Sequence, residues 1–253
     1  MSSEPIALAV IGGTGLYRLA GLEDAEAVLH ATPYGDPSGA ARVGRFAGRR
    51  VAFLARHGEG HALPPHRVNY RANLWLLQEL GVGRVVAVNS VGGITDAYGP
   101  RAIGVPDQLI DYTQGRVSSF SDMPGAEVRH VDFGEPYSRG LRQALLEAAR
   151  AAGAEPVDGG VYGCTEGPRL ETRAEIARMR RDGCDLVGMT GMPEAVLARE
   201  LGLDYACLAL VANWAAGCGP APEVEITMAD VLANMEAAIA PLPAVLERLL
   251  AAR

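Results

Sequence analysis

Residues 69–94 read NYRANLWLLQELGVGRVVAVNSVGGI, and this stretch decides the fold class. Its first half places apolar residues at helical spacing and ends at Gly81, a residue typical of helix stops. Its second half contains the largely apolar run VVAVNSV, as strands do when both faces of a sheet are covered. That run ends in a glycine turn at Gly92. A helix leading directly into a buried strand indicates an α/β protein.

The rest of the chain repeats this alternation. Further strands are expected within residues 6–17, 51–56, 159–164, 184–190 and 204–217, and helices within residues 140–153, 165–183, 193–202 and 226–253. The last helix is expected to kink at Pro241 and Pro243. Residues 100–136 are rich in turn formers and are expected to carry long loops and an edge strand.

Buried strands that alternate with helices predict a mostly parallel sheet with helices on both faces. No internal repeat and no low-complexity linker divides the sequence. We therefore expect one domain over residues 1–253.

Composition narrows the function. The chain is 49% hydrophobic and 21% charged over 253 residues, which is typical of a globular enzyme. Its net charge of −7 and its scattered basic residues argue against nucleic acid or an anionic membrane as a partner. No apolar run is expected to reach the length that spans a bilayer, and MSSEPIALAV lacks the basic region and cleavage site of a signal peptide. We expect a cytoplasmic protein.

The residue types also limit the chemistry. All 23 basic residues are arginine, which excludes Schiff-base formation and a P-loop because both need a lysine amine. The four cysteines lack C-x-x-C spacing and are expected as buried side chains in a reducing compartment. His57 and His61 have the spacing of zinc ligands on a helix, but the Gly-Glu-Gly between them disfavours a helix. The sequence predicts neither a metal nor an organic cofactor.

Four expected strands end in polar or glycine-rich turns, and in α/β sheets ligands bind at these carboxyl ends. The turns are GGTG at 12–15, RHG at 56–58, NSVGG at 89–93 and MTG at 189–191. Together they supply the hydroxyls of Thr14 and Thr190, the guanidinium of Arg56, the imidazole of His57 and backbone amides around Ser90. This donor set suits a tetrahedral dianion such as phosphate.

Four longer motifs resemble those of the trimeric purine nucleoside phosphorylase and methylthioadenosine phosphorylase family. They are IGGTGLY, LARHGEGHALPPHRVNYRANLWLLQELG, TEGPRLETRAEI and MTGMPEAVLARE, in the family's order. The resemblance implies an α/β sandwich around a central mixed, partly barrel-like sheet flanked by helices, and a homotrimer with pockets at subunit interfaces. It also implies a purine-salvage transferase that uses inorganic phosphate as co-substrate to cleave a purine from its ribose.

The resemblance also assigns roles to individual residues. The phosphate ligands that it implies are Thr14, Arg56, His57, the backbone at Ser90, and Thr190. Met189 matches a methionine that packs against the ribose. His130 and Phe133 resemble a segment with which the neighbouring subunit closes the sugar pocket.

Two positions bear on the purine. Adenine-cleaving members resemble T-D-Y-D after the last core strand, whereas this chain has Ala-Asn-Trp-Ala, with Asn213 second and Ala215 last. An asparagine can donate to O6 and accept from N7–H together, which an ionised aspartate cannot do. Glu171, where the adenine type has serine, can accept from the N1–H of hypoxanthine. These residues predict that the base is a 6-oxopurine. The alternative is that the substitutions at these positions are functionally neutral and do not determine the base.

One position bears on the sugar. Members that act on 5′-hydroxyl nucleosides resemble a histidine near the start of the C-terminal helix, where this chain has Met228. Met228, Val231 and Leu232 together predict an apolar lining that suits a 5′-methylthio group and leaves a hydroxyl unpaired.

We therefore expect S-methyl-5′-thioinosine to be converted to hypoxanthine and 5-methylthioribose 1-phosphate, with Asn213, Glu171 and His57 as the catalytic residues. Methylthioadenosine phosphorolysis and general 6-oxopurine (inosine or guanosine) phosphorolysis are open alternatives. More remote alternatives are a hydrolytic nucleosidase and a non-catalytic nucleoside-binding protein.

Overall fold

The computed structural model describes residues 4–123 and 125–252. The strands are β1 (Leu8–Gly12), β2 (Glu23–Val28), β3 (Ala41–Phe46), β4 (Arg49–Ala55), β5 (Arg84–Gly93), β6 (Ile103–Val105), β7 (Gln108–Asp111), β8 (Val157–Asp158), β9 (Val161–Cys164), β10 (Leu186–Gly188) and β11 (Asp204–Trp214). The helices are α1 (Tyr70–Glu79), α2 (Arg139–Ala151), α3 (Arg173–Arg181), α4 (Glu194–Glu200), α5 (Met228–Ile239) and α6 (Leu242–Ala251). Each strand and helix expected from the sequence is present at or near its expected range.

The eleven-stranded sheet divides along β5. On one edge, β5 pairs in parallel with β11 over nearly its whole length. On the other edge, Val85–Ala87 pair with β1, whereas Gly92 and Gly93 pair with β10. From β1 the sheet continues through β4, β3 and β2, and from β10 it continues through β9 and β7. Residues 88–91 of β5 therefore lie at a fork between two branches of the sheet.

The sheet is mixed, as the family resemblance implies. Six strand pairs are parallel, and the four antiparallel pairs are β2–β3, β3–β4, β5–β10 and β6–β11. The majority of parallel pairs agrees with the mostly parallel sheet expected from the alternation, but the sequence did not predict β2 and β3, which form only antiparallel pairs. The sequence of β2, EDAEAV, is charged and largely exposed, so it lacks the apolar pattern of a buried strand.

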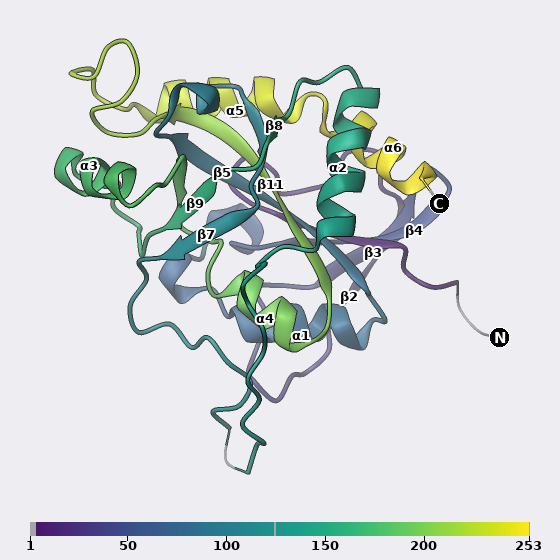
Figure 1. The fold of residues 1–253 in the computed structure, drawn as a ribbon. Coiled ribbons are helices and arrows are strands. Elements are labelled where there is room, and N and C mark those ends of the chain that lie inside the picture. Colours follow the sequence, from purple (N-terminus) through teal and green to yellow (C-terminus); the bar gives the residue numbers. More distant parts are fainter. Residues whose placement is uncertain (1–3, 124, 253) are drawn as a thin grey trace.

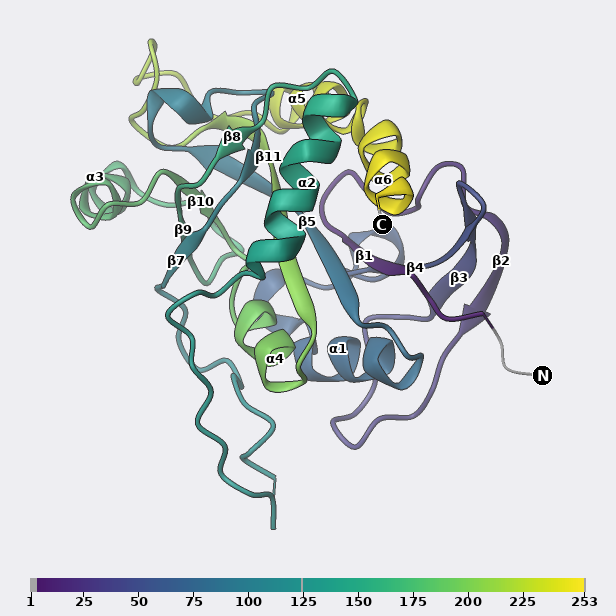
Figure 2. The same ribbon diagram turned by 45° about the vertical axis from the view of Figure 1, so that its right-hand side comes forward.

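Helices cover both faces of the sheet. In β1, Ala9 and Ile11 point into one hydrophobic core, whereas Leu8 and Val10 point into the other, as the two-residue period of a strand requires. The first core includes side chains of α1 and α4, and the second includes side chains of α2, α5 and α6. Figures 1 and 2 show α1 and α4 together on one side of the sheet and α2 and α6 on the other.

The expected C-terminal helix is two helices, because α5 ends before Pro241 and α6 begins after it. Together Met228–Ala251 are long and apolar enough to span a membrane by length and composition alone. This corrects the expectation that no such run exists. Both helices bury an apolar face in the second core, through Val231 and Met235 of α5 and Leu246 and Leu249 of α6. Core helices of folded domains pass the same test of length and composition.

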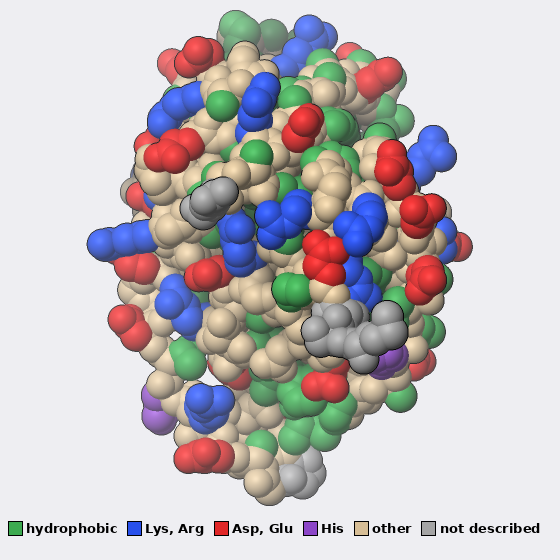
Figure 3. Space-filling view, turned by 90° about the vertical axis from the view of Figure 1, so that its right-hand side faces the viewer, with side chains coloured by type: hydrophobic (Ala, Val, Ile, Leu, Met, Phe, Trp, Pro, Cys, Tyr) green, Lys and Arg blue, Asp and Glu red, His purple; other side chains and the backbone are tan. Residues whose placement is uncertain are grey.

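Charged side chains of both signs share the surface. On the face shown in Figure 3, arginines are interspersed with aspartates and glutamates. Arginines of the described residues form ion pairs, including Arg45 with Glu4 and Arg142 with Asp158. These carboxylates compensate the positive charge locally.

Candidate active site

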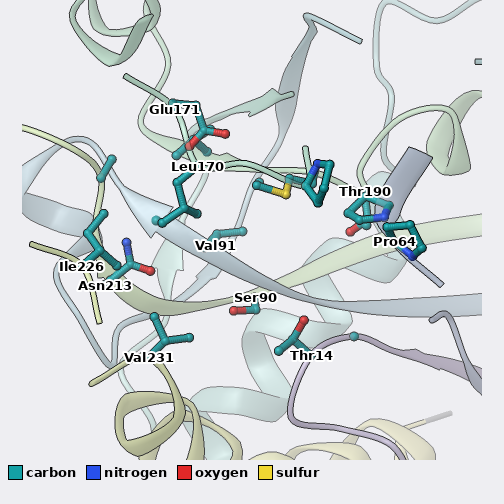
Figure 4. Close-up of a pocket in the computed structure, with 18 of the residues that line it drawn as sticks. Thr14, Pro64, Ser90, Val91, Leu170, Glu171, Thr190, Asn213, Ile226 and Val231 are labelled. Carbon is teal, nitrogen blue, oxygen red and sulfur yellow. The ribbon is translucent and has the colours of Figure 1, made fainter. Parts of the chain in front are cut away.

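A cavity of about 420 Å³ opens at the fork in the sheet. Ten residues predicted for the site line it, namely Thr14, Arg56, His57, Ser90, Glu171, Met189, Thr190, Asn213, Met228 and Val231. Figure 4 shows two separate ends: Thr14, Ser90 and Thr190 lie at one, and Glu171 and Asn213 lie at the other. We call the first the anion end and the second the base end.

The turn after β1 requires glycine because the backbone passes close to two other segments. A Cβ atom at Gly13 would lie 2.8 Å from the Val88 carbonyl oxygen and 3.0 Å from Nη1 of Arg56. The turn also accepts a hydrogen bond, from the backbone N–H of Arg56 to the Gly12 carbonyl at 2.9 Å. This close approach places Thr14 at the anion end, beside the end of β4.

Arg56 is fully buried and paired with a carboxylate that the sequence analysis did not single out. Its Nε and Nη2 donate to the two carboxylate oxygens of Glu194 at 2.7 and 2.8 Å, and its Nη1 donates to the Val88 carbonyl at 3.1 Å. The Tyr205 hydroxyl also donates to Glu194, at 2.8 Å. Burial alone would lower the pKa of Arg56, but the charge and hydrogen bonds of Glu194 raise it above its usual value. The guanidinium thus stays charged, and a carboxylate neutralises it locally.

His57 lies beside Arg56 and is also buried. Its Nδ1 is 2.8 Å from the carbonyl oxygen of Leu63. Burial, with a smaller contribution from the positive charge of Arg56, lowers the pKa of His57 to about 4. The ring is therefore neutral at physiological pH, when the anion end is empty.

Thr190 follows β10 and is held by Asn89 of β5. The Asn89 amide donates from Nδ2 to the Thr190 hydroxyl oxygen at 2.8 Å. Asn89 is fully buried, and its Oδ1 lies 3.5 Å from Nη2 of Arg56 and 3.6 Å from the Cys207 sulfur. The side-chain amide of Asn89 therefore contacts two residues of the anion end, Arg56 through its oxygen and Thr190 through its nitrogen.

At the base end, a β-bulge directs Asn213 into the cavity. The register of β11 against β5 shifts between Val211 and Asn213, so that Asn213 pairs with Gly92. A Cβ atom at Gly92 would lie 3.4 Å from Nδ2 of Asn213, so glycine leaves room for this side chain. Nδ2 donates to the Trp214 carbonyl at 2.7 Å. One amide N–H and the amide oxygen of Asn213 remain for a ligand.

Glu171 is placed by the start of α3. Thr172 and Glu175 form a capping box there, and Glu171 directly precedes it. The Thr165 hydroxyl donates to Oε1 of Glu171 at 2.5 Å. Burial raises the pKa of Glu171, against the opposing effect of the Thr165 hydrogen bond. The second carboxylate oxygen is left to accept from a base.

Two of the three residues predicted to line the 5′ pocket, Met228 and Val231, line the cavity. Thr227 caps α5, so Met228 begins the helix at the mouth of the cavity, and Val231 faces inward one turn later. Leu232 is a correction: it lies outside the cavity, with 51% of its surface exposed. One residue advances a helix by about 100°, so Leu232 cannot share the inward face of Val231. Ile226, which the sequence analysis missed, joins this apolar wall.

The segment predicted to reach a neighbouring subunit does not enter the cavity of its own chain. His130 is exposed, and Phe133 packs partly buried against the first hydrophobic core. Figure 1 shows this part of the chain extending away from the sheet. Its contribution to a second subunit remains a prediction.

Other features of the site were only partly visible in the sequence. Of the residues that the sequence analysis missed, only Glu194 stands out in the sequence. It is a carboxylate at the start of a largely apolar helix that follows M-T-G-M-P. Nothing in the local pattern distinguishes Asn89 or Thr165 from ordinary strand-end residues. Within residues 4–123 and 125–252, no group of three or more His, Cys, Asp or Glu side chains is placed to hold a metal ion.

Known proteins share this sequence and fold. The family model described as the Phosphorylase superfamily matches residues 7–251. A protein from Xanthomonas campestris pv. campestris named "Probable S-methyl-5′-thioinosine phosphorylase" is 66% identical over 243 residues, which cover 96% of each chain. A solved methylthioadenosine phosphorylase sourced from an antarctic soil metagenomic library has a TM-score of 0.90 and 36% identity, over 98% of this chain and 86% of that one.

A second solved structure carries a ligand. The methylthioadenosine phosphorylase from Schistosoma mansoni in complex with adenine has a TM-score of 0.90 and 29% identity, over 97% of this chain and 91% of that one. The family model covers nearly the whole chain, and the four segments predicted to bind an anion, at residues 12–15, 56–58, 89–93 and 189–191, all contribute to the lining of a single cavity. On this evidence the chain belongs to the phosphorylase superfamily.

Proposed function

We propose that this enzyme cleaves S-methyl-5′-thioinosine with inorganic phosphate, giving hypoxanthine and 5-methylthioribose 1-phosphate. The observation that carries the proposal is the placement of Asn213 and Glu171 at one end of a cavity whose other end gathers Thr14, Ser90 and Thr190. The name of the Xanthomonas relative supports the same substrate.

The base end suits hypoxanthine. The free N–H of Asn213 can donate to O6 while its oxygen accepts from N7–H, and Glu171 can accept from N1–H. Adenine presents an amino donor and an unprotonated N1, so Glu171 would face a lone pair. Ala215, which also lines the cavity, supplies no carboxylate for the amino group. A mismatched buried hydrogen-bonding group costs about 1–3 kcal/mol, and two mismatches favour the 6-oxopurine by about two decades or more.

The sugar end suits a methylthio group. Met228, Val231 and Ile226 form an apolar wall at the mouth of the cavity. A thioether packs against such a wall, whereas a 5′-hydroxyl there would lose its hydrogen bonds to water. This separates the proposed substrate from inosine and guanosine.

The reaction needs charge stabilisation more than covalent chemistry. As the C1′–N9 bond breaks, its electron pair moves to the base, and the base takes up a proton from water at N7, beside Oδ1 of Asn213. Monohydrogen phosphate releases its own proton to water when its oxygen bonds to C1′, so the protons balance. The phosphate at the anion end stabilises the cationic C1′ and then forms the new C1′–O bond. Catalysis then rests on positioning and on electrostatics in a partly enclosed cavity.

The remaining parts of the proposal concern the setting of the enzyme. We propose a cytoplasmic homotrimer that needs no metal and no organic cofactor, with phosphate as its second substrate. The support for the trimer is the resemblance of His130 and Phe133 to a segment that closes a neighbour's pocket. The support for cofactor-free chemistry is that the proposed steps use only residues of this chain and phosphate.

The deciding experiment measures release of free purine from methylthioinosine, methylthioadenosine and inosine, each with and without phosphate. We expect the highest kcat/KM for methylthioinosine and no turnover without phosphate. Equal turnover without phosphate would indicate a nucleosidase, and binding without turnover would indicate a nucleoside-binding protein. A preference for methylthioadenosine or inosine would contradict the proposed substrate while leaving phosphorolysis in place.

A further inference from the structure

At the anion end, the ring of His57 presents a nitrogen that can only accept a hydrogen bond. A carbonyl oxygen has no proton, so the 2.8 Å contact between Nδ1 of His57 and the Leu63 carbonyl requires the proton on Nδ1. In the neutral ring, Nε2 then carries a lone pair. The ring lines the cavity, and among the described residues Nε2 has no hydrogen-bond partner. Nε2 is also not one of the fully buried unpartnered atoms, so it is open to the cavity.

The neutral form of His57 is maintained by its surroundings. The side chain is only 4% exposed, and Arg56 directly precedes it in the chain. A second proton on the ring would add a cation next to the buried guanidinium. The His61 ring, whose centroid lies 4.5 Å away, supplies no negative charge to offset it.

Other groups at this end can donate hydrogen bonds, and Asn89 constrains the direction of one of them. Arg56 and the Cys207 thiol both approach Oδ1 of Asn89, so the amide must turn its Nδ2 toward Thr190. The Thr190 oxygen accepts that N–H, and its own proton cannot point back along the same line. The proton of the Thr190 hydroxyl is therefore available to donate into the cavity. A second donor comes from Arg56, which has five N–H groups and uses four within the protein.

We infer that the anion end selects oxyanions that carry one proton, with His57 as the residue that sets this specificity and Asn89 as a positioning residue that acts through Thr190. Monohydrogen phosphate can donate its single P–O–H to Nε2 of His57 while its other oxygens accept from Thr190 and Arg56. Sulfate has a similar size and the same charge but no proton at neutral pH, so one of its oxygens would face the Nε2 lone pair. This inference rests on the proposed phosphate-dependent function and states how that site distinguishes between anions.

The first test compares anions on the wild-type enzyme. One buried mismatch corresponds to about 10- to 100-fold in affinity. We therefore expect the competitive inhibition constant of sulfate to exceed the phosphate KM by at least that factor, whereas arsenate, which also carries a proton, replaces phosphate. A sulfate inhibition constant close to the phosphate KM would overturn the inference. If no nucleoside is cleaved with phosphate, the proposed function fails instead, and calorimetric titration with phosphate and sulfate still tests the selectivity.

The second test changes the acceptor. The side-chain amide of His57→Gln can rotate to offer either a donor or an acceptor, so the preference for phosphate over sulfate should fall by about 10-fold or more. His66→Gln is the matched control, because His66 is exposed and lies outside the cavity. It should leave the ratio at its wild-type value. An undiminished ratio in a folded His57→Gln enzyme would contradict the role of His57.

The third test is a double-mutant cycle on Asn89 and Thr190. The carboxylate of Asn89→Asp would accept the Thr190 proton and turn that donor away from the cavity, raising the phosphate KM by about 10-fold with little change in the nucleoside KM. In the Thr190→Val background, which has no hydroxyl, Asn89→Asp should add little to the phosphate KM. Thermal unfolding of each variant identifies those that are folded. Additive effects of the two changes would show that Asn89 does not act through Thr190.

Discussion

The carboxylate of Glu194 accepts two hydrogen bonds from the guanidinium of Arg56, at 2.7 and 2.8 Å, and neither side chain reaches solvent. Arg56 is therefore less a free cation than one half of a neutral, buried pair. An anion at this site is bound mainly by hydrogen-bond donors of fixed geometry. The pair has no net charge, so it adds little electrostatic attraction for the anion. The pair also joins the end of β4 to the start of α4, so that anion binding and folding depend on the same contact.

Removing one member of this pair should affect both properties. Arg56→Ala leaves Glu194 buried without its partner, and we expect a loss of about 3–5 kcal/mol in the free energy of unfolding. In Arg56→Met/Glu194→Leu, the pair is replaced by apolar groups, and much of that stability should return while the phosphate KM stays high. Urea unfolding and phosphate kinetics on both variants check this. A folded variant without Arg56 but with an unchanged phosphate KM would remove Arg56 from the anion end.

Asn213 and Glu171 should act together on the purine. Asn213→Asp alone gives the base end two acceptors, so it should damage methylthioinosine cleavage while only partly admitting methylthioadenosine. Asn213→Asp combined with Ala215→Asp and Glu171→Ser should shift the preference to methylthioadenosine. The effects should be non-additive because the three side chains address one ring.

The measurement for the purine is kcat/KM for both methylthio nucleosides in the wild type, the single variant and the triple variant. A preference of the wild-type enzyme for methylthioadenosine would by itself contradict the proposed specificity for a 6-oxopurine.

The purine preference should also depend on pH. Burial raises the pKa of Glu171, so this carboxylate takes up a proton at a higher pH than an exposed glutamate does. Protonated Glu171 is a donor, so it no longer accepts from the N1–H of hypoxanthine. It can instead donate to the unprotonated N1 of adenine. The ratio of kcat/KM for methylthioinosine to that for methylthioadenosine should therefore fall as pH decreases. Glu171→Gln, which does not titrate, is the control and should give a ratio independent of pH.

Met228 should control the 5′ group. Met228→His places a hydrogen-bonding side chain at the mouth of the cavity, where Met228 is 64% exposed. We expect kcat/KM for inosine to rise relative to methylthioinosine, because the 5′-hydroxyl gains a partner. Leu232→His is the matched control on the same helix, and its side chain lies outside the cavity. An identical shift in both variants would mean that the effect does not come from the 5′ pocket.

Assembly can be tested by mixing two inactive variants. If Phe133 completes the pocket of a neighbouring subunit, Phe133→Ala damages a neighbour's site, whereas Asn213→Ala damages its own. Mixed oligomers formed by refolding the two together should then contain some intact sites and regain activity. Light scattering of the wild type should give the mass of a trimer. A fully active monomer would exclude a pocket shared between subunits.

The sequence predicted most of the fold because the central strands are apolar and end at glycine. β1, β4, β5, β10 and β11 all match expected ranges, and residues in or just after their carboxyl ends line one cavity. Residues 89–93, which were expected as a turn, are instead the last residues of β5. β2 was missed because it is charged and largely exposed, and β3 because its apolar residues are few and are separated by two arginines and a glycine. The inward aim of Asn213 depends on a bulge in β11, and the role of Asn89 depends on contacts with distant segments. Long-range geometry of this kind leaves no periodic signal in a sequence.

The fork in the sheet has a consequence for how this protein can change. The anion end is carried by the middle of β5 and by residues that follow β1, β4 and β10, whereas the base end is carried by β11 and the loop before α3, and β5 contributes to both. A lineage can therefore exchange one purine for another through substitutions at Glu171, Asn213 and Ala215 without disturbing the residues that hold the shared co-substrate. The fold therefore allows the leaving purine to change while the attacking phosphate stays the same, because mostly different strands hold the two groups.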